Sequence, residues 1–143
     1  VAPAFRSTTA LIVWNASPSV AIGLYGVAHR RPDSGELALV RLPDTIAQFA
    51  DRRGYLPRSA LLIKPVAATV GDRVCRFGAD VFVRSQFVAR AATENESLPT
   101  WHGCRTLKGG ELFLLTDHPE SFDSRYFGPL HAKHVIGTAV PIW

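Results

Sequence analysis

The apolar residues of this chain come in short runs, and that spacing limits what the chain can fold into. Each run is rich in Val, Leu, Ile and Phe, and turn-forming residues separate it from the next run. None approaches the roughly 18 apolar residues that a membrane-spanning helix needs. Short runs bounded by turn residues are typical of antiparallel β-sheets. We therefore expect a mainly β fold, with strands at 11–14, 22–27, 37–42, 61–68, 73–77, 80–88, 111–115 and 135–142.

One segment has the spacing of a helix instead. Apolar residues recur at helical intervals within residues 45–53, Asp44 stands where an N-cap would, and Gly54 follows as a stop signal.

Residues 91–108 are different again, because they are polar and contain Pro and Gly. We expect a long loop or hairpin extension there, tied down by another part of the chain. The 143 residues suffice for a hydrophobic core, and we expect one domain spanning 1–143.

The composition argues against some classes of protein. Apolar residues make up 47% of the chain and charged residues 20%, which is ordinary for a globular protein and not for a disordered one. The net charge of +4 is spread along the sequence, with tight basic pairs only at 30–31 and 52–53. Nucleic-acid binding needs basic residues clustered on one face, so we expect no nucleic-acid partner. A mildly basic face beside an anionic membrane surface fits this pattern.

Two cysteines, Cys75 and Cys104, can be free thiols, a metal pair or one disulfide. A zinc site needs about four well-placed ligands, and the chain has no Cys-x-x-Cys pair. His131 and His134 have no acidic partner at metal spacing, and we interpret them as surface histidines. We expect no metal and no other cofactor. We favour a disulfide that closes a loop of about 30 residues, which indicates an oxidising compartment.

Lys64 is out of place, because it interrupts the apolar run at 61–68. Pro65 favours extended backbone at Lys64, in agreement with a strand. Two interpretations are open. The side chain can snorkel with its ammonium group in water, or it can be desolvated, in which case burial lowers its pKa. A fall from about 10.4 to about 7 corresponds to roughly 4–5 kcal/mol, and a neutral lysine can take a proton from a serine hydroxyl.

Ser17 and Ser19 lie where a polar turn enters the apolar run at 22–27. Such a position can expose a hydroxyl, so Ser19 is a candidate nucleophile with Ser17 beside it. Both are also ordinary turn residues, and this segment alone does not decide between the two interpretations. The sequence has no Gly-x-Ser-x-Gly elbow, no His-Glu-x-x-His zinc motif and no Gly-rich nucleotide-binding loop.

Three segments, taken in order, resemble the type I signal peptidase family. Asn-Ala-Ser-Pro-Ser-Val-Ala-Ile-Gly-Leu-Tyr at 15–25 is similar to its nucleophile box, and Lys-Pro-Val-Ala-Ala-Thr-Val-Gly-Asp at 64–72 to its general-base box. Ser-Phe-Asp-Ser-Arg-Tyr-Phe-Gly-Pro at 121–129 looks like the family's Asp-Ser-Arg-Tyr-Phe-Gly-Pro box. The resemblance is greatest to the conjugative-transfer branch, the TraF-like pilin-processing peptidases, and the tail at 135–143 is similar to that branch's closing strand.

The resemblance implies a role for each matching side chain. Ser19 takes the position of the nucleophile, and Lys64 takes that of the general base. Ser17 corresponds to the hydroxyl that forms the oxyanion hole together with the Ser19 backbone N–H. Ser121 corresponds to the serine that hydrogen-bonds and orients the lysine.

Asp123 and Arg125 correspond to an ion pair that supports the site without contacting the substrate. Two positions depart from the family's pattern. Ala21 stands where the family usually has Pro, which loosens the turn after Ser19. Val70 replaces a Pro that is often found before the Gly-Asp pair. Neither departure removes a catalytic atom.

The family's fold is an antiparallel structure of two sheets or a distorted barrel. The resemblance implies this fold here, with the short helix near 45–53 and a disulfide-tied hairpin extension at about 75–108. It also implies an N-terminal membrane anchor in the full-length protein, which we expect to be absent from this chain. The catalytic domain is then expected on the periplasmic, extracytoplasmic face of the inner membrane.

The implied activity is that of a serine endopeptidase with a Ser–Lys dyad, a variant of triad catalysis. Its expected partner is a pilin precursor, or another secreted preprotein with small residues before the cleaved bond, in conjugative transfer. The acyl-enzyme is hydrolysed by water, or the substrate's own N-terminal amine attacks it and the product is cyclic. Alternatives are a general type I signal peptidase, a catalytically inactive peptide-binding assembly component, and a zinc-bound structural module. Ala21 is the only support for the inactive component.

Overall fold

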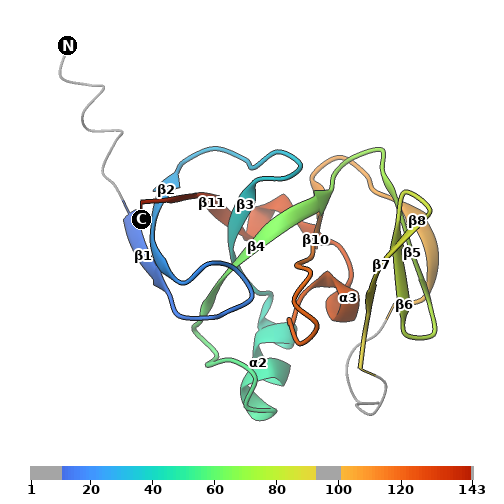
Figure 1. The fold of residues 1–143 in the computed structure, drawn as a ribbon, viewed down its shortest axis with the longest axis horizontal. Coiled ribbons are helices and arrows are strands. Elements are labelled where there is room, and N and C mark those ends of the chain that lie inside the picture. Colours follow the sequence, from blue (N-terminus) through green and yellow to red (C-terminus); the bar gives the residue numbers. More distant parts are fainter. Residues whose placement is uncertain (1–10, 93–100, 143) are drawn as a thin grey trace.

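The computed structural model describes residues 11–92 and 101–142. Most of these residues lie in antiparallel strands that form two sheets (Figure 1). The larger sheet has seven strands in the order β1-β2-β11-β3-β4-β9-β10, and the smaller has four in the order β7-β6-β5-β8. The mainly β, two-sheet fold expected from the sequence is therefore confirmed.

The strands of the larger sheet are β1 (Leu11–Asn15), β2 (Gly23–Ala28), β3 (Leu37–Arg41), β4 (Leu61–Ala68), β9 (Glu111–Leu114), β10 (Leu130–His131) and β11 (Val135–Pro141). Those of the smaller sheet are β5 (Arg73–Phe77), β6 (Asp80–Val83), β7 (Gln86–Arg90) and β8 (Gly103–Thr106). The helices of the described residues are α2 (Asp44–Arg52), α3 (Ser124–Phe127) and the 3-10 helix η1 (Ala132–His134).

The centre of the larger sheet is covered on both faces, because its middle strands carry apolar side chains on both sides. In β3, Ala38 and Val40 belong to the core that α2 covers, whereas Leu39 belongs to the core on the opposite face. The register pairs Leu62 of β4 with Val40, and Lys64 with Ala38. Paired residues point to the same side of a sheet, so Lys64 lies on the face that α2 covers.

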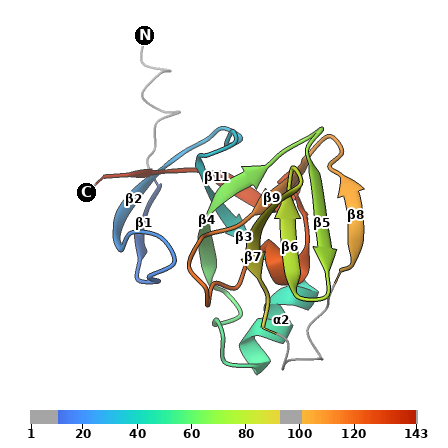
Figure 2. The ribbon, with the colours of Figure 1, turned by 45° about the vertical axis from the view of Figure 1, so that its right-hand side comes forward.

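Strand β9 connects the two sheets through the alternation of its side chains. Leu112 and Leu114 pack in the core beneath α2. Phe113, between them, packs against Val74 and Val81 of the smaller sheet. Figure 2 shows the four strands of the smaller sheet beside β9, with α2 below them. One strand thus contributes to both cores, which fixes the smaller sheet against the larger.

The disulfide between Cys75 and Cys104 is present, with an S–S distance of 2.08 Å. The two residues are direct partners in the register of β5 and β8. This confirms the pairing favoured from the sequence and leaves neither cysteine as a zinc ligand. The expected hairpin extension at 75–108 is the smaller sheet, whose strands run from residue 73 to residue 106. Part of the polar segment at 91–108, residues 93–100, lies outside the described residues.

The predicted strand at 80–88 is wrong, because the chain reverses within it. Residues 80–83 form β6 and residues 86–90 form β7, joined by Arg84 and Ser85 with φ angles of 51° and 69°. Two left-handed residues in succession make a tight hairpin turn. Such turns usually contain Gly, Asn or Asp, so the sequence carried no turn signal here.

The predicted helix at 45–53 is confirmed in kind, but its N-cap is wrong. Pro43 is the N-cap residue and Asp44 is the first residue of α2. Pro43 makes no side-chain cap bond, and Asp44 instead places a negative charge in the first turn, where it is favourable. Gly54, with φ of 72°, follows the helix as expected. The short elements β8, α3, β10 and η1 were not predicted.

We expect the double variant Cys75→Ala and Cys104→Ala to lower the free energy of unfolding by about 3–4 kcal/mol, because it frees a loop that the disulfide closes. The sequence separation of the two cysteines is 29 residues. Urea unfolding followed by circular dichroism measures the change. An unfolding midpoint equal to that of the parent chain would show that the disulfide contributes nothing to stability.

Candidate active site

Lys64 lies in the middle of β4 with its side chain buried. Only 3% of the residue is exposed. Leu62 and Val66 share its face of the strand, and both belong to the core beneath α2. Its partner on β3 is Ala38, whose small side chain leaves room for the long lysine side chain. Of the two interpretations drawn from the sequence, the structure has the desolvated lysine and not the snorkelling one.

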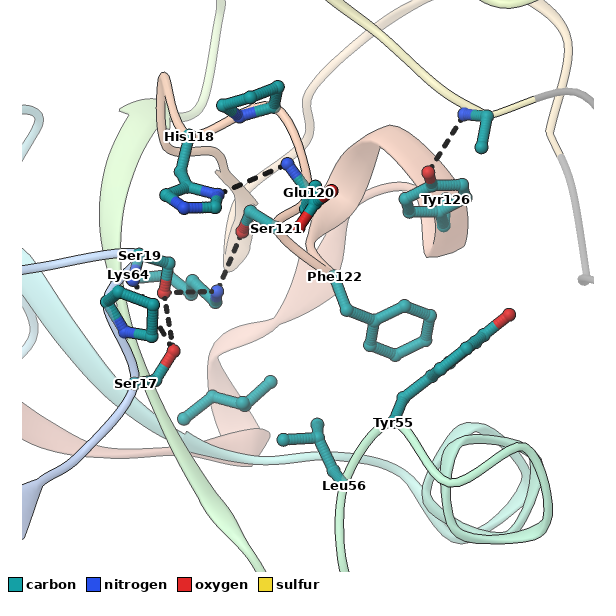
Figure 3. A pocket seen from close by; sticks show the side chains of 14 residues that line it. Ser17, Ser19, Tyr55, Leu56, Lys64, His118, Glu120, Ser121, Phe122 and Tyr126 are labelled. Carbon is teal, nitrogen blue, oxygen red and sulfur yellow. Dashed lines mark hydrogen bonds between the residues drawn. The ribbon is translucent and has the colours of Figure 1, made fainter.

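The Lys64 amine contacts two serine hydroxyls (Figure 3). Its Nζ donates to Oγ of Ser19 at 2.9 Å and to Oγ of Ser121 at 2.7 Å. The Oγ of Ser17 lies 3.1 Å from the Oγ of Ser19. Ser17 and Ser19 come from the turn between β1 and β2, whereas Ser121 precedes α3. The fold therefore brings together all four residues, which are far apart in the sequence.

The side chain of Asn15 holds the turn that carries Ser17 and Ser19. Its Nδ2 donates to the carbonyl oxygens of Ser17 at 2.9 Å and Ala21 at 3.1 Å. The Tyr25 hydroxyl donates to the same carbonyl of Ala21. Ala21 is thus fixed from two sides, although it lacks the ring of the Pro usual at this position. These hydrogen bonds restrain the turn that the substitution was expected to loosen.

Asp123 and Arg125 form a buried ion pair behind Ser121. The Nε of Arg125 donates to Oδ1 of Asp123 at 2.7 Å, and its Nη2 donates to Oδ2 at 3.0 Å. The two residues are 0% and 2% exposed. Arg125 also donates to the backbone carbonyls of Thr116 at 2.8 Å and His118 at 3.1 Å. A buried charge pair is stable only when its remaining donors are satisfied, and these bonds fix the segment that presents Ser121.

Burial lowers the pKa of Lys64 from its ordinary 10.5 to about 8. The negative charge of Asp123 opposes this and raises the pKa, whereas the positive charge of Arg125 lowers it. With a pKa near 8, roughly a tenth of the amine is neutral at pH 7. The site therefore holds a base of suitable strength within hydrogen-bond distance of a serine hydroxyl.

A cleft of about 440 Å³ opens beside these groups, a volume in the range of ligand-binding clefts. One wall is polar and carries the three serines and Lys64. The other wall is apolar and centres on Phe122, whose ring lies 5.6 Å from that of Tyr55 and is stacked 5.8 Å from that of Tyr126. The cleft is lined by Ser17, Pro18, Ser19, Tyr55, Leu56, Leu62, Lys64, Ala92, His118, Pro119, Glu120, Ser121, Phe122 and Tyr126.

Sequence reasoning missed the apolar wall and several supporting residues. Tyr55 and Leu56 follow α2 and reach the cleft only through tertiary packing, so no local pattern marks them. His118 and Glu120 stand just before the box at 121–129, and this adjacency could have drawn attention to them. Arg76 of β5 is buried, and it donates to the backbone carbonyl of Arg125 at 2.7 Å. It joins the smaller sheet to α3.

The arrangement is suited to general-base-assisted nucleophilic attack. It places a hydroxyl beside an amine of lowered pKa, with two further hydroxyls within reach. Within residues 11–92 and 101–142, no three His, Cys, Asp or Glu side chains gather as a metal site would require.

The chain is similar to several known proteins. The family described as "Signal peptidase, peptidase S26" matches residues 2–143. The conjugal transfer protein TraF of Agrobacterium fabrum is 35% identical, over 90% of this chain and 80% of that protein. The plasmid transfer protein TraF of Escherichia coli is 27% identical over the same shares. A signal peptidase I from Enterococcus faecalis, solved by crystallography, aligns with a TM-score of 0.45 and 16% identity, over 78% of this chain and 98% of that one.

We expect Lys64→Met to stabilise the protein at neutral pH, because it removes the cost of burying an ammonium group. Lowering the pKa of Lys64 from 10.5 to about 8 corresponds to about 3 kcal/mol. This cost is complete below pH 8, where the lysine is protonated in both the folded and unfolded states. It disappears as the pH rises toward 10.5, because the unfolded state then also loses its proton.

The difference in unfolding free energy between Lys64→Met and the parent should therefore shrink between pH 8 and pH 10.5. Urea unfolding at several pH values measures it. The same change at the exposed Lys133 is the matched control, since it removes a charge that water already solvates. A difference that stays constant over this pH range would show that Lys64 is not desolvated.

Proposed function

Because this chain belongs to the signal peptidase family, peptidase S26, we propose that it is a serine endopeptidase that cleaves secreted precursors with Ser19 and Lys64. The observation that carries the proposal is the 2.9 Å distance between the Lys64 amine and the Ser19 hydroxyl. A serine hydroxyl is a weak nucleophile until an adjacent base activates it. Lys64 is that base, since burial lowers its pKa to about 8.

The first half of the reaction forms an ester. The neutral amine of Lys64 takes the hydroxyl proton while Ser19 Oγ bonds to the carbonyl carbon of the scissile peptide. The ammonium group then gives this proton to the leaving amine, and the carbon–nitrogen bond breaks. The precursor's carbonyl remains bound to Ser19 as an acyl-enzyme, and Lys64 is neutral again.

The second half releases the acyl group. Lys64 takes a proton from water as the water oxygen attacks the ester carbonyl, and Ser19 leaves with that proton. In the alternative step, the amine at the substrate's own N-terminus attacks instead of water, and the product is cyclic. Both steps use the same base and the same ester.

The Ser17 hydroxyl and the Ser19 backbone N–H are the donors that we assign to the oxyanion hole. Without substrate, the Ser19 N–H donates to the Ser17 Oγ at 3.4 Å. This is long for a hydrogen bond, so little is lost when both donors turn to a substrate oxygen. One such donor is commonly worth about 10²–10³ in kcat.

Ser121, Asp123 and Arg125 act by positioning the Lys64 amine. Ser121 accepts a hydrogen bond from Lys64 at 2.7 Å, which directs the amine toward Ser19. The Asp123–Arg125 pair holds the segment that carries Ser121. Its opposite charges also keep a net charge away from the lysine, which leaves burial as the main influence on the Lys64 pKa.

The substrate that we propose is a pilin precursor or another secreted preprotein of conjugative transfer, with small residues before the cleaved bond. The relatives from Agrobacterium fabrum and Sinorhizobium fredii, 35% and 34% identical, are named as conjugal transfer proteins, the latter as a probable one. We propose that this chain also acts in conjugative transfer. The apolar wall beside the dyad supports the binding of an extended peptide with apolar side chains.

We place this activity at the periplasmic, extracytoplasmic face of the inner membrane. The Cys75–Cys104 disulfide supports this, because disulfides persist in oxidising compartments. In the described part of the chain, no helix has the length and apolar character to cross a bilayer.

The membrane surface is the second partner that we propose, and the outer side of β1, β2 and β11 supports it. These three strands contain no charged residue. The register aligns Ile12, Gly26 and Val140 in one row and Trp14 with Leu24 in the next. Large exposed apolar side chains in one patch mark an interaction surface. We call this patch the apolar face; its exposed side chains are Ile12 (54%), Trp14 (63%), Leu24 (40%), Val140 (46%) and Ile142 (49%).

We expect the chain to cleave a propilin-like peptide that carries an Ala-x-Ala site, and Lys64→Ala to slow cleavage by at least about 10³-fold, as loss of a catalytic base does. The parent rate should rise with pH, reach half of its maximum near pH 8, where the Lys64 amine is half neutral, and level off above that. Mass spectrometry of both products is the measurement. A product one water lighter than the linear fragment identifies cyclisation.

The exposed Lys108 is a matched control, since Lys108→Ala removes the same group outside the cleft. Equal losses in the two variants would contradict the assignment of Lys64 as the base. Failure of the folded parent to cleave any of several peptides would favour the inactive peptide-binding component, which the Ala21 substitution suggests. Cleavage at many unrelated sites would favour a general signal peptidase.

A further inference from the structure

A second cavity, of about 450 Å³, lies between the segment after β2 and the segment before β11. None of its lining residues lines the catalytic cleft. Five of its nine lining residues are basic and none is acidic. We call it the basic pocket; it is lined by His29, Arg30, Arg31, His131, Ala132, Lys133, Val135, Ile136 and Gly137.

Among the residues that the structure describes, two cations of the basic pocket form no ion pair. Arg30 is neutralised by Glu36, to which it donates two hydrogen bonds of 2.7 Å. Glu36 also accepts from the backbone N–H of Asp33 at 2.8 Å, so its carboxylate is already occupied. Within the described residues, neither Arg31 nor Lys133 forms an ion pair. They come from different segments and line the same cavity, so an anion between them would relieve their repulsion.

The backbone around the basic pocket is held in place. The hydroxyl of Thr138 donates to the backbone carbonyl of Arg30 at 2.8 Å. Gly137 packs tightly against β2, because a Cβ there would lie 2.5 Å from the carbonyl oxygen of Ala28. This close contact and the Arg30–Glu36 pair fix the segment that carries Arg31, so that walls of the pocket are already formed without a ligand.

The basic pocket and the apolar face share the strand β11. Gly137, in its lining, and Val140, on the apolar face, belong to the same strand, β11. On β2, Ala28 pairs with Thr138 and Gly26 pairs with Val140. Along the chain, Arg31 follows Gly26 by five residues, and Lys133 precedes Val140 by seven. Apolar side chains beside unpaired cations suit the boundary between acyl chains and phosphate groups of a bilayer.

We propose that the basic pocket binds the phosphate of an anionic phospholipid headgroup while the apolar face rests on the bilayer. This inference builds on the membrane partner proposed above. The Arg31 guanidinium supplies a planar pair of donors that matches two phosphate oxygens, and Lys133 supplies a point charge. The apolar face favours a lipid over free phosphate, because a soluble anion would gain nothing from it.

The test is binding of the chain to vesicles, with charge-matched variants. We expect Arg31→Gln with Lys133→Gln to weaken binding to phosphatidylcholine vesicles containing phosphatidylglycerol by about tenfold or more, from about 1 kcal/mol per cation near an anionic surface. The control is Arg58→Gln with Arg73→Gln, which removes two charges from exposed residues outside the basic pocket. It should weaken binding less than about threefold, since exposed charges farther from the surface are screened.

Equal weakening in the two double variants would overturn the proposal, because net charge alone would then explain binding. A pocket variant that binds vesicles as the parent does, while losing affinity for inorganic phosphate in solution, would assign the site to soluble phosphate and overturn it as well. Cleavage of a soluble peptide by the pocket variant should equal that of the parent. Peptidase activity and lipid binding are thus measured separately, so failure of one proposal is distinguishable from failure of the other.

Discussion

The burial of one amine organises this structure. Lys64 lies on the core face of β4, where an ammonium group is costly. Its two short hydrogen bonds go to Ser19 and Ser121, which belong to separate parts of the chain. The first is held by the Asn15 side chain at the turn after β1, and the second by the Asp123–Arg125 pair at the start of α3. Both supporting groups are themselves buried, so the amine can reach its partners only in the complete fold.

The smaller sheet and the apolar wall support this arrangement from the other side. Arg76 of β5 bonds to the backbone of Arg125, and Phe113 of β9 packs in the core of the smaller sheet. The disulfide ties β5 to β8. The aromatic residues around Phe122 form the apolar wall of the cleft. The stability lost in burying Lys64 is thus offset by packing elsewhere, as is common where a site needs a perturbed group.

Much of the fold and of the site was predictable from the sequence. The rest was not, for physical reasons. Apolar runs with turn signals located most strands, and the helix with its Gly54 stop was recognisable. The hairpin at Arg84 and Ser85 was not, because non-glycine residues adopt the left-handed conformation there. The site residues were found by resemblance, since the pattern around Lys64 alone favoured a snorkelling side chain over a buried one. The apolar wall of Tyr55 and Phe122 arises from tertiary packing, which no local pattern encodes.

The central claim is that the Lys64 amine is desolvated and loses its proton near neutral pH. Titration of isotope-labelled lysines by NMR tests this most directly. The chain has only three lysines, at 64, 108 and 133, and Lys64→Met assigns the signal of interest. We predict that the Lys64 signal titrates with a midpoint near 8, as burial lowers its pKa. A midpoint near the ordinary 10.5 would contradict the account, because Lys64 would then be charged and unable to activate Ser19.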